Sequence, residues 1–451
     1  MDIKQIAKII NEKGGNLYLV GGAVRDQILN RKNNDEDYCV TGISSEQFLQ
    51  LFPNVITKGK FFEVFELEGK EFAMARTEQK NKSSENEHTN FTILTHKCIT
   101  IEEDLARRDI TINAIAQNVL TNEIIDPFNG INDIKNKIIK ATTTAFSEDP
   151  LRVYRVARIA AELEFNVEDN TIKLMSKLKQ QLATLSGERV VNELRKALNT
   201  NCPSIFFQVL KKADLLNVHF KEIQNLIGAL QPIDKHPEGD AFNHTMQVLD
   251  FTANEIKLLN IKENKYEILF GALVHDLGKG ITPKEEYPHH YNHDINGVKL
   301  VWKLGERIKA PIKWIKAGET VCREHMKGGI FYKMTPQKQV KFIEQVSKTV
   351  IGLEGLQIIV NADKISRRKI ILEEDNIINN TKLYMNIINK DQNEIAIKKQ
   401  KMDFQEIGKK CIQEINGKYI LEKYKISQGI KLAQRLYEER VEWMKNLQKN
   451  M

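Results

Sequence analysis

The spacing of hydrophobic positions changes along the chain close to residue 149. Before it, short β-type runs alternate with helical stretches: LYLV (17–20), VRDQIL (24–29), DYCVTG (37–42), a capped helix from Ser44, FFEVFELEG (61–69) and EFAMART (71–77). From Asp149 onward, apolar residues recur three and four positions apart, as in LRVYRVARIAAELEF and ERVVNELRKALN. The pattern predicts an α/β head followed by helices.

A turn-rich segment marks a second change. PIDKHPEGDAF (232–242) gathers Pro, Gly and Asp after a helical run, and a histidine-rich stretch follows it, so we expect a domain boundary near residue 230. Four segments are therefore expected: a head over 1–140, a helical neck and body over 141–229, a histidine-rich domain over 230–345 and a C-terminal helical region over 346–451.

Composition favours a globular protein outside the membrane. Of the 451 residues, 41% are hydrophobic and 28% are charged, and no stretch approaches the roughly 18 unbroken apolar residues that a bilayer span needs. The first 15 residues lack the apolar core and cleavage site of a secretory signal, so we expect a cytoplasmic protein.

The cysteines and the net charge add little. Five cysteines, Cys39, Cys98, Cys202, Cys322 and Cys411, are spread without a CxxC pair, which predicts reduced thiols. The formal net charge of +7 weakly favours an anionic partner, although many proteins carry such an excess for solubility alone.

The first candidate site is a glycine turn. LVGGAVRD (19–26) places Gly21 and Gly22 between a β-type run and a helix, where backbone N–H groups can approach a phosphate. Arg25 follows one turn into that helix with a guanidinium suited to phosphate. A tight strand-to-helix turn without a ligand would use the same glycines.

Two carboxylates follow about ten residues later. Asp35 and Asp37 are two positions apart at the start of the next strand and should project from one face. Such a pair is costly unless a cation lies between them, and hard oxygen ligands beside a phosphate loop suit Mg²⁺. A solvated acidic turn is the alternative.

These motifs resemble the nucleotidyltransferase superfamily of DNA polymerase β type, class II branch. Four further family motifs follow in order: LARRDITINAIA (105–116), EIIDPFNGINDIKN (123–136), EDPLRVYRVARIA (148–160) and SGERVVNEL (186–194). The resemblance implies an α+β fold, with a polymerase-β-like head of mixed sheet and helices. It also implies that Asp35 and Asp37 are catalytic and bind Mg²⁺, and that the nucleotide is bound by Gly22, Arg25, Arg108, Arg152, Arg155 and Arg158.

The EDPLRVYRVAR motif indicates how bases are selected. Asp149, Arg152, Arg155 and Arg158 recur every three residues and would form a ridge on a helix. Asp149 can accept from the amino group of cytosine or adenine while Arg152 donates to ring acceptors, which leaves the other two arginines for triphosphate. An exposed, salt-bridged helix face is the alternative.

Two neighbouring features have less specific interpretations. We expect Asp109 to be a structural partner of an arginine, so it is not counted among the site residues. The polar segment 77–94 fits a loop over the site as readily as an inert excursion.

A second metal centre is expected further along the chain. VHDLGKG resembles the HD phosphohydrolase signature, and its H…HD…D pattern implies that His244, His275, Asp276 and Asp363 bind metal. Such a mixed nitrogen and oxygen set suits Ni²⁺, Mn²⁺ or Co²⁺. Second-rank candidates for a wider site or substrate contacts are His290, His293 and His325, and Lys279 is a candidate for facing phosphate.

The fusion of the two motif sets resembles the bacterial multifunctional CCA-adding enzymes. The resemblance implies addition and repair of the 3′-terminal CCA of tRNA from CTP and ATP, with release of pyrophosphate. It also implies phosphatase, 2′-nucleotidase and 2′,3′-cyclic phosphodiesterase activities of the HD domain. A poly(A) polymerase of the same family and a catalytically reduced RNA-binding protein are the alternatives, and monomer and homodimer both remain open.

Overall fold

The protein consists of two compact units, Met1–Leu185 and Ser186–Met451. The computed structural model describes residues 1–32, 36–58, 64–80, 91–95, 97–367, 403–424 and 430–450. The division between the units falls inside the predicted neck and body segment, 141–229, and the four segment boundaries expected from the sequence stay predictions.

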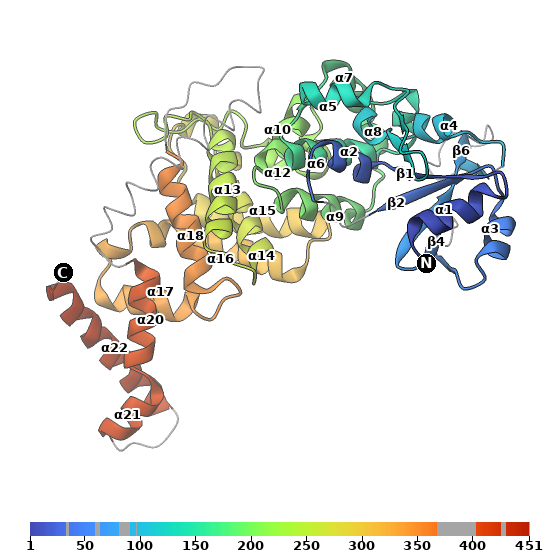
Figure 1. Cartoon of the computed structure of the whole chain (residues 1–451). Coiled ribbons are helices and arrows are strands. Elements are labelled where there is room, and N and C mark those ends of the chain that lie inside the picture. The colour runs from blue at the N-terminus through green and yellow to red at the C-terminus, as the bar shows by residue number, and fades with distance from the viewer. Residues whose placement is uncertain are drawn as a thin grey trace. The chain divides into compact units, whose positions relative to one another are not determined.

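A seven-stranded mixed sheet forms the centre of the first unit (Figure 1). Its strands, in spatial order, are β3 (Ile56–Lys58), β4 (Val64–Leu67), β5 (Lys70–Met74), β2 (Asp37–Thr41), β1 (Asn16–Val20), β8 (Ala116–Asn118) and β9 (Ile124–Ile125). Strand β2 runs antiparallel to β1 and parallel to β5. The predicted mixed sheet is therefore confirmed.

The pairing of β1 with β2 positions the first candidate site. Val20, the last residue of β1, lies opposite Asp37, the first residue of β2. Immediately after Val20, Gly21 adopts a φ of 72° in the left-handed region that favours glycine, and helix α2 (Gly22–Ile28) begins. The glycine turn and Asp37 thus share one end of two adjacent strands.

Helices pack beside this sheet and continue the first unit. They are α1 (Ile3–Asn11), α3 (Ser45–Leu51), α4 (Ile101–Ala106), α5 (Gly130–Asn136), α6 (Leu151–Leu163), α7 (Asp169–Lys177) and α8 (Lys179–Leu182), with short 3₁₀ turns η1 (Thr111–Asn113) and η2 (Thr144–Glu148). Ser44 caps α3 by accepting from the backbone N–H of Gln47, as its sequence predicts. Buried residues of α4, including Leu105, pack with Tyr18 and Val20 of β1.

Two small strand pairs depart from the sequence expectations. The ends of the polar segment 77–94 belong to strands β6 (Arg76–Lys80) and β7 (Phe91–Thr95), which pair antiparallel, and residues 81–90 lie outside the described residues. Strand β11 (Asn166–Val167) pairs with β10 (Ile138–Ile139), although only helices were expected after Asp149. Two-residue strands carry no periodicity, so sequence patterns miss them.

The regular elements described in the second unit are helices, as predicted, with one isolated β-bridge between Leu230 and Asp240. Its helices are α9 (Gly187–Leu198), α10 (Ser204–Lys212), α11 (Leu216–His219), α12 (Lys221–Gln224), α13 (Ala241–Leu258), α14 (Lys265–Val274), α15 (His293–Arg307), α16 (Ile312–Gly329), α17 (Pro336–Val346), α18 (Gly352–Ile365), α20 (Phe404–Glu414), α21 (Gly417–Tyr424) and α22 (Ile430–Asn450). Short 3₁₀ turns are η3 (Leu277–Ile281), η4 (Lys284–Glu286) and η5 (Phe331–Lys333).

Helices α13, α14, α16 and α18 pack against one another in the middle of this unit (Figure 1). Close approach depends on glycine at one point near the histidines. A Cβ atom on Gly278 would lie 2.0 Å from the backbone oxygen of His293, so η3 and the start of α15 touch through a position that has no side chain. This contact holds His293 beside the HD motif.

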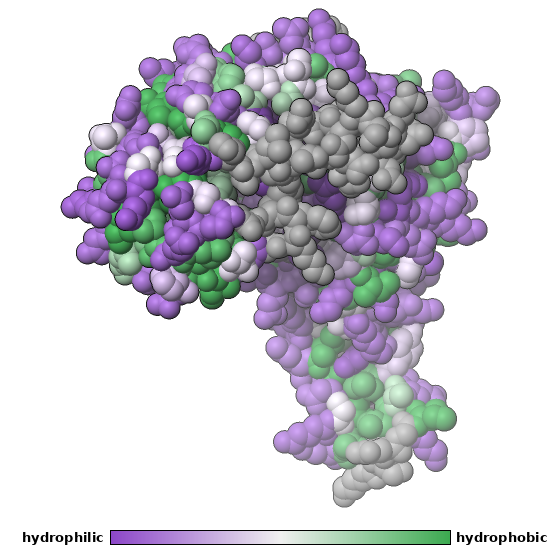
Figure 2. All heavy atoms as spheres, turned by 90° about the vertical axis from the view of Figure 1, so that its right-hand side faces the viewer, coloured by the Kyte–Doolittle hydropathy of each residue, from purple (hydrophilic) through white to green (hydrophobic). Residues whose placement is uncertain are grey.

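The surface drawn in Figure 2 is largely hydrophilic, with hydrophobic residues in scattered patches. Within the described residues, none of the helices combines the length and the apolar character that crossing a bilayer requires.

Candidate functional site

The glycine turn in the first unit lies against the guanidinium of Arg108. A Cβ atom on Gly21 would lie 2.7 Å from Nη1 of Arg108, so the guanidinium rests on the turn. Arg108 is held there by Asp104 of α4, whose Oδ2 accepts from Nη2 at 3.1 Å. Asp104 is buried and also accepts from Arg107. Sequence motifs pointed to Arg108 but not to the carboxylate that holds it.

A chain of polar side chains connects two of the predicted nucleotide-binding arginines. Arg25 is buried, and its Nη1 donates to Oδ1 of Asn113 at 2.8 Å. Asn113 donates to Asp109 at 3.3 Å, and Asp109 accepts from Nε of Arg155 at 2.8 Å. Arg25 also donates to Asp26. The expectation that Asp109 pairs with an arginine is confirmed, and the arginine is Arg155.

Burial alone would keep the Asp109 carboxyl neutral, but the Arg155 guanidinium outweighs burial and lowers the pKa of Asp109 below its ordinary value. The side chain of Arg155 is itself 41% exposed, so the guanidinium reaches the surface while its Nε remains anchored.

The helix carrying the arginines begins later than predicted. α6 starts at Leu151, with Pro150 before it, so Asp149 precedes the helix and does not share its ridge with Arg152, Arg155 and Arg158. Its Oδ1 accepts from the backbone N–H of Leu151 at 2.9 Å. The ridge expected from spacing is therefore shorter by one residue, because proline disfavours the helical conformation of the residue before it and Asp149 is extended, with φ −118° and ψ 110°.

The three arginines on α6 differ in their surroundings. Arg152 is buried and its Nη1 donates to the backbone oxygen of Ala145 at 2.6 Å. Arg158 donates to Glu162 at 2.9 Å. Each of the three thus has a fixed partner before any ligand binds.

One of the two predicted metal carboxylates lies within the described residues. Asp37 is exposed at the start of β2, and Asp35 lies outside the described residues. Between them, Glu36 interacts with Lys70 and accepts from the Tyr38 hydroxyl at 2.9 Å, so it is used structurally. Of the two predicted metal carboxylates, the structure therefore places Asp37 at the strand end beside the glycine turn.

The second unit brings all four predicted HD residues together. His244 comes from α13, His275 and Asp276 lie between α14 and η3, and Asp363 lies on α18. Nε2 of His244 is 3.1 Å from Oδ1 of Asp363 and 3.7 Å from Oδ2 of Asp276. Nε2 of His275 is 3.1 Å from the same Asp276 oxygen. The cluster is completely or nearly completely buried.

Two second-rank histidines join this cluster and the third does not. Nε2 of His293 lies 3.3 Å and Nε2 of His325 lies 3.5 Å from Oδ1 of Asp276. His290 instead uses both ring nitrogens elsewhere, with Thr282 and the backbone oxygen of Leu230. Spacing alone could not separate these three.

Lys279 lies inside the cluster. Its Nζ is 2.6 Å from Oδ2 of Asp276 and donates to Gln231 at 2.5 Å. Burial would raise the pKa of Asp276. The interactions with His275 and Lys279 outweigh burial and hold that pKa well below its usual range, which favours the ionised carboxylate.

The buried donor atoms fit a divalent metal. Among the described residues, Nε2 of His244, His275 and His293 and Oδ1 of Asp276 are buried and make no hydrogen bond. Burial lowers the pKa of His275 and of His293, which favours the neutral imidazole that a metal needs. Buried polar atoms without partners are costly, and a cation held by His244, His275 and Asp276, or by Asp276, His293 and His325, would satisfy those it contacts.

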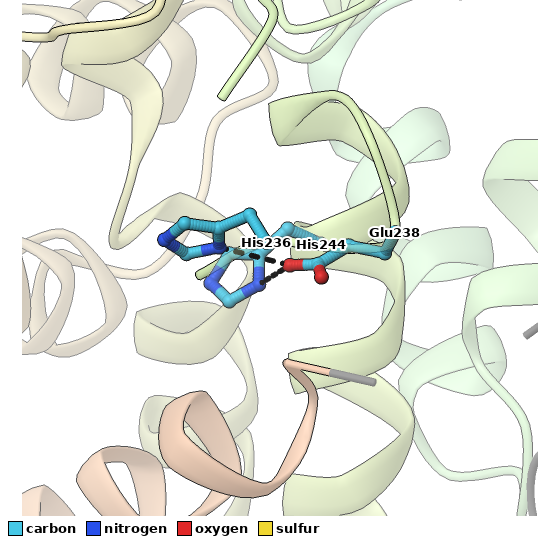
Figure 3. A group of neighbouring side chains, drawn as sticks. All are labelled: His236, Glu238 and His244. Atoms are coloured by element: carbon cyan, nitrogen blue, oxygen red, sulfur yellow. Dashed lines mark hydrogen bonds and ion pairs between the residues drawn. The ribbon is translucent and has the colours of Figure 1, made fainter. Parts of the chain in front are cut away.

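A buried glutamate adjoins this cluster and was not identified from the sequence. Oε1 of Glu238 lies 2.9 Å from Nδ1 of His236 and 2.7 Å from Nδ1 of His244, and Figure 3 shows both rings directed at that one oxygen. Burial opposes ionisation of Glu238, but hydrogen bonds from the two histidines lower its pKa to about 2. The sequence HPE at 236–238, which lies in a turn, could have indicated this glutamate, but it is not part of the H…HD…D pattern.

Comparison with known proteins matches three parts of the chain. Residues 17–140 match the family described as poly A polymerase head domain, 164–227 match the probable RNA and SrmB-binding site of polymerase A, and 241–367 match the HD domain.

Solved structures share the fold over nearly the whole chain. A Thermotoga maritima CCA-adding enzyme complexed with tRNA covers 98% of this chain and 92% of its own, with a TM-score of 0.59 and 19% identity. A CCA-adding enzyme in complex with ATP covers 98% and 90%, with a TM-score of 0.59 and 19% identity.

Curated relatives are more similar in sequence. The multifunctional CCA protein of Mannheimia succiniciproducens is 41% identical over 337 residues, which is 73% of this chain and 78% of the relative. That of Haemophilus influenzae is 44% identical over 317 residues, covering 68% and 74%. The nucleotidyltransferase head, the HD donor set and these identities lead to one conclusion: the chain belongs to the multifunctional CCA protein family, nucleotidyltransferases that carry an HD domain.

Proposed function

We propose that the protein adds and repairs the 3′-terminal CCA of tRNA from CTP and ATP. The observation that carries this proposal is the presence, in one chain, of the arginine-lined glycine turn beside Asp37 and of the buried HD donor set. Its curated relatives are named multifunctional CCA proteins, and structural neighbours of the same fold were solved with ATP, with CTP and with tRNA.

In the proposed reaction, the tRNA 3′ hydroxyl attacks the α-phosphate of the nucleotide, and the bond to pyrophosphate breaks. Asp35 and Asp37 would hold Mg²⁺, which supplies positive charge to the entering and leaving oxygens. Gly22, Arg25 and Arg108 bind the nucleotide around the glycine turn. Arg108 is preorganised for this role because Asp104 fixes its guanidinium before the nucleotide arrives.

Base choice is assigned to Asp149 and Arg152. The Asp149 carboxylate accepts from the amino group of cytosine or adenine, and the Arg152 guanidinium donates to a ring acceptor on the same edge. Their bonds to Leu151 and to Ala145 limit the motion of both side chains. Arg155 and Arg158 bind the triphosphate, with Arg155 anchored by Asp109.

The HD centre is proposed to hydrolyse phosphomonoesters, 2′-nucleotides and 2′,3′-cyclic phosphates. His244, His275, Asp276 and Asp363 would hold Ni²⁺, Mn²⁺ or Co²⁺, which activates water for attack on phosphorus. Lys279, inside the same cluster, supplies a cation for a substrate phosphate. The donor set extends to His293 and His325 through Asp276.

The deciding experiment is the sequence of the product formed on a tRNA that lacks its 3′ end. With CTP and ATP together, CCA addition yields the same tRNA extended by C, C and A. A run of adenosines from ATP alone would instead identify a poly(A) polymerase. Binding of the tRNA without extension would identify a catalytically reduced RNA-binding protein.

A further inference from the structure

Four imidazoles around Asp276 share one hydrogen-bonding arrangement. In each ring, Nδ1 lies within hydrogen-bond distance of an acceptor outside the cluster, and Nε2 faces Asp276. The Nδ1 acceptors are the backbone oxygens of Ala272 for His275, of His290 for His293 and of Val321 for His325, and the carboxylate of Glu238 for His244. An oxygen accepts only from a protonated Nδ1, so in the neutral form of each ring it is Nε2 that carries the lone pair a metal ligand needs.

His244 differs from the other three because its partner is a carboxylate. A carboxylate that accepts from the outer nitrogen of an imidazole fixes the ring orientation and makes the inner nitrogen a more basic ligand than a carbonyl does. Glu238 is buried in the described structure, and its Oε1 lies 2.7 Å from Nδ1 of His244. His244 is therefore the ring whose ligand strength depends most on a replaceable side chain.

The turn that carries Glu238 is itself fixed at both ends. Gln231 donates its backbone N–H to Gly239 at 3.1 Å, and Gly239 has a φ of 95°, which favours glycine. Asp240 caps α13 through Asn243 and accepts from the backbone of Gly228 with its other oxygen. Glu238 consequently approaches His244 from a turn that is hydrogen-bonded at both ends, and Nδ1 of His236 shares the same carboxylate oxygen.

We infer that Glu238 is a positioning residue of the HD metal centre, which fixes His244 in the tautomer and orientation that present Nε2 to the metal. The inference rests on the metal centre proposed above. It adds a residue outside the H…HD…D pattern, and it predicts that loss of this one carboxylate weakens metal binding even though every ligand remains.

The test measures metal binding directly. The full-length protein is stripped with chelator and titrated with Co²⁺, whose visible absorption reports coordination geometry. Glu238→Gln keeps the size of the side chain but removes its charge, and Glu285→Gln makes the same change at an exposed position of the same unit. We expect Glu238→Gln to weaken Co²⁺ binding about 10- to 100-fold and to alter the absorption bands, and Glu285→Gln to do neither.

A second variant tests whether the effect comes from Glu238 itself or from its other partner, His236. His236→Phe removes one donor from the shared oxygen and leaves the bond between Glu238 and His244, so its loss of affinity should be smaller than that of Glu238→Gln. Equal affinity and equal spectra for Glu238→Gln and the parent would overturn the inference, and so would a loss in His236→Phe as large as that in Glu238→Gln.

The assay also distinguishes this inference from the function on which it rests. Absence of Co²⁺ binding by the parent protein would reject the metal centre itself. Nucleotide addition by the head, measured on the same samples, should be unchanged in all variants and shows that each preparation is folded.

Discussion

The two candidate centres differ in whether their buried polar groups have partners within the protein. In the first unit, Arg25, Arg155 and Arg158 already have carboxylate or amide partners from the protein, and Nε of Arg108 is the buried atom of the glycine-turn arginines that makes no hydrogen bond within the described residues. In the second unit, several buried donor atoms of the HD cluster make no hydrogen bond within the described structure. The arginines of the head are held by protein groups before any ligand binds, whereas the HD cluster is a polar core whose unpartnered atoms suit a cation.

The two centres should carry out their reactions independently of each other. We predict that Asp37→Ala, or Asp35→Ala, abolishes nucleotide addition, because the loss of a metal ligand removes several kcal/mol of transition-state stabilisation, or about a thousandfold or more in rate. Hydrolysis of a 2′,3′-cyclic phosphate should persist at the parent rate. Both activities are measured on one preparation, and simultaneous loss from a folded protein contradicts the two-centre scheme.

The reciprocal change tests the other centre. We predict that His275→Ala or Asp276→Ala eliminates cyclic-phosphate hydrolysis, since each removes a ligand from the buried cluster, while CCA addition continues near its original rate. Metal content by elemental analysis should fall in parallel. Full hydrolysis with unchanged metal content would mean that the ligands are assigned incorrectly.

The difference in buried polar atoms predicts a stability effect confined to the HD centre. Addition of Ni²⁺, Mn²⁺ or Co²⁺ at about 100 times its dissociation constant should stabilise the folded state by about 2.7 kcal/mol, because the metal binds the folded cluster. The melting temperature of the chelator-treated protein should rise accordingly, as followed by circular dichroism. In His275→Ala, the same addition should produce little shift, and an undiminished shift would show that the metal binds elsewhere.

The smallest expected effect concerns base choice in the head. Exchanging Asp149 and Arg152 should weaken use of CTP and ATP and let UTP or GTP compete, with a change of roughly tenfold or more in relative incorporation, since a good bidentate contact is worth about 1 to 3 kcal/mol. Competition assays with pairs of nucleotides measure the change. Removal of Arg152 alone should lower both correct nucleotides together.

A structural control is available for that exchange. Asp149 also accepts from the backbone of Leu151, so Arg at 149 loses this hydrogen bond. Asp149→Asn keeps an acceptor for Leu151 and changes only the remaining edge of the side chain. If the exchanged protein retains the CTP and ATP preference over UTP, base choice comes from elsewhere, most simply from the RNA end.

Local patterns predicted those parts of the molecule whose determinants lie close together in sequence. The cap at Ser44, the strand before Gly21 and the helices of the second unit all follow from residues within a few positions of one another. The HD ligands were predicted because their spacing matches a known pattern, and the structure brings His244 and Asp363 within 3.1 Å although 119 positions separate them.

The remainder depends on contacts that sequence spacing does not encode. Asp149 fits the three-residue repeat, but Pro150 delays the start of α6 and removes it from the ridge. Asp104 and Glu238 are buried acids whose roles come from the arginine or imidazole that folding places beside them. The sequence around such a carboxylate does not indicate which side chain it will contact in the folded protein.

The contact at Gly278 has a consequence for which substitutions this protein can tolerate. Replacing its hydrogen by a methyl group, which is ordinarily the mildest substitution, would place carbon 2.0 Å from the backbone oxygen of His293 and force η3 and α15 apart. His293 would move with α15, away from Asp276. At this position, the tolerance of the protein is therefore governed by distance between backbones, and ranking substitutions by chemical similarity would misjudge which ones evolution can accept.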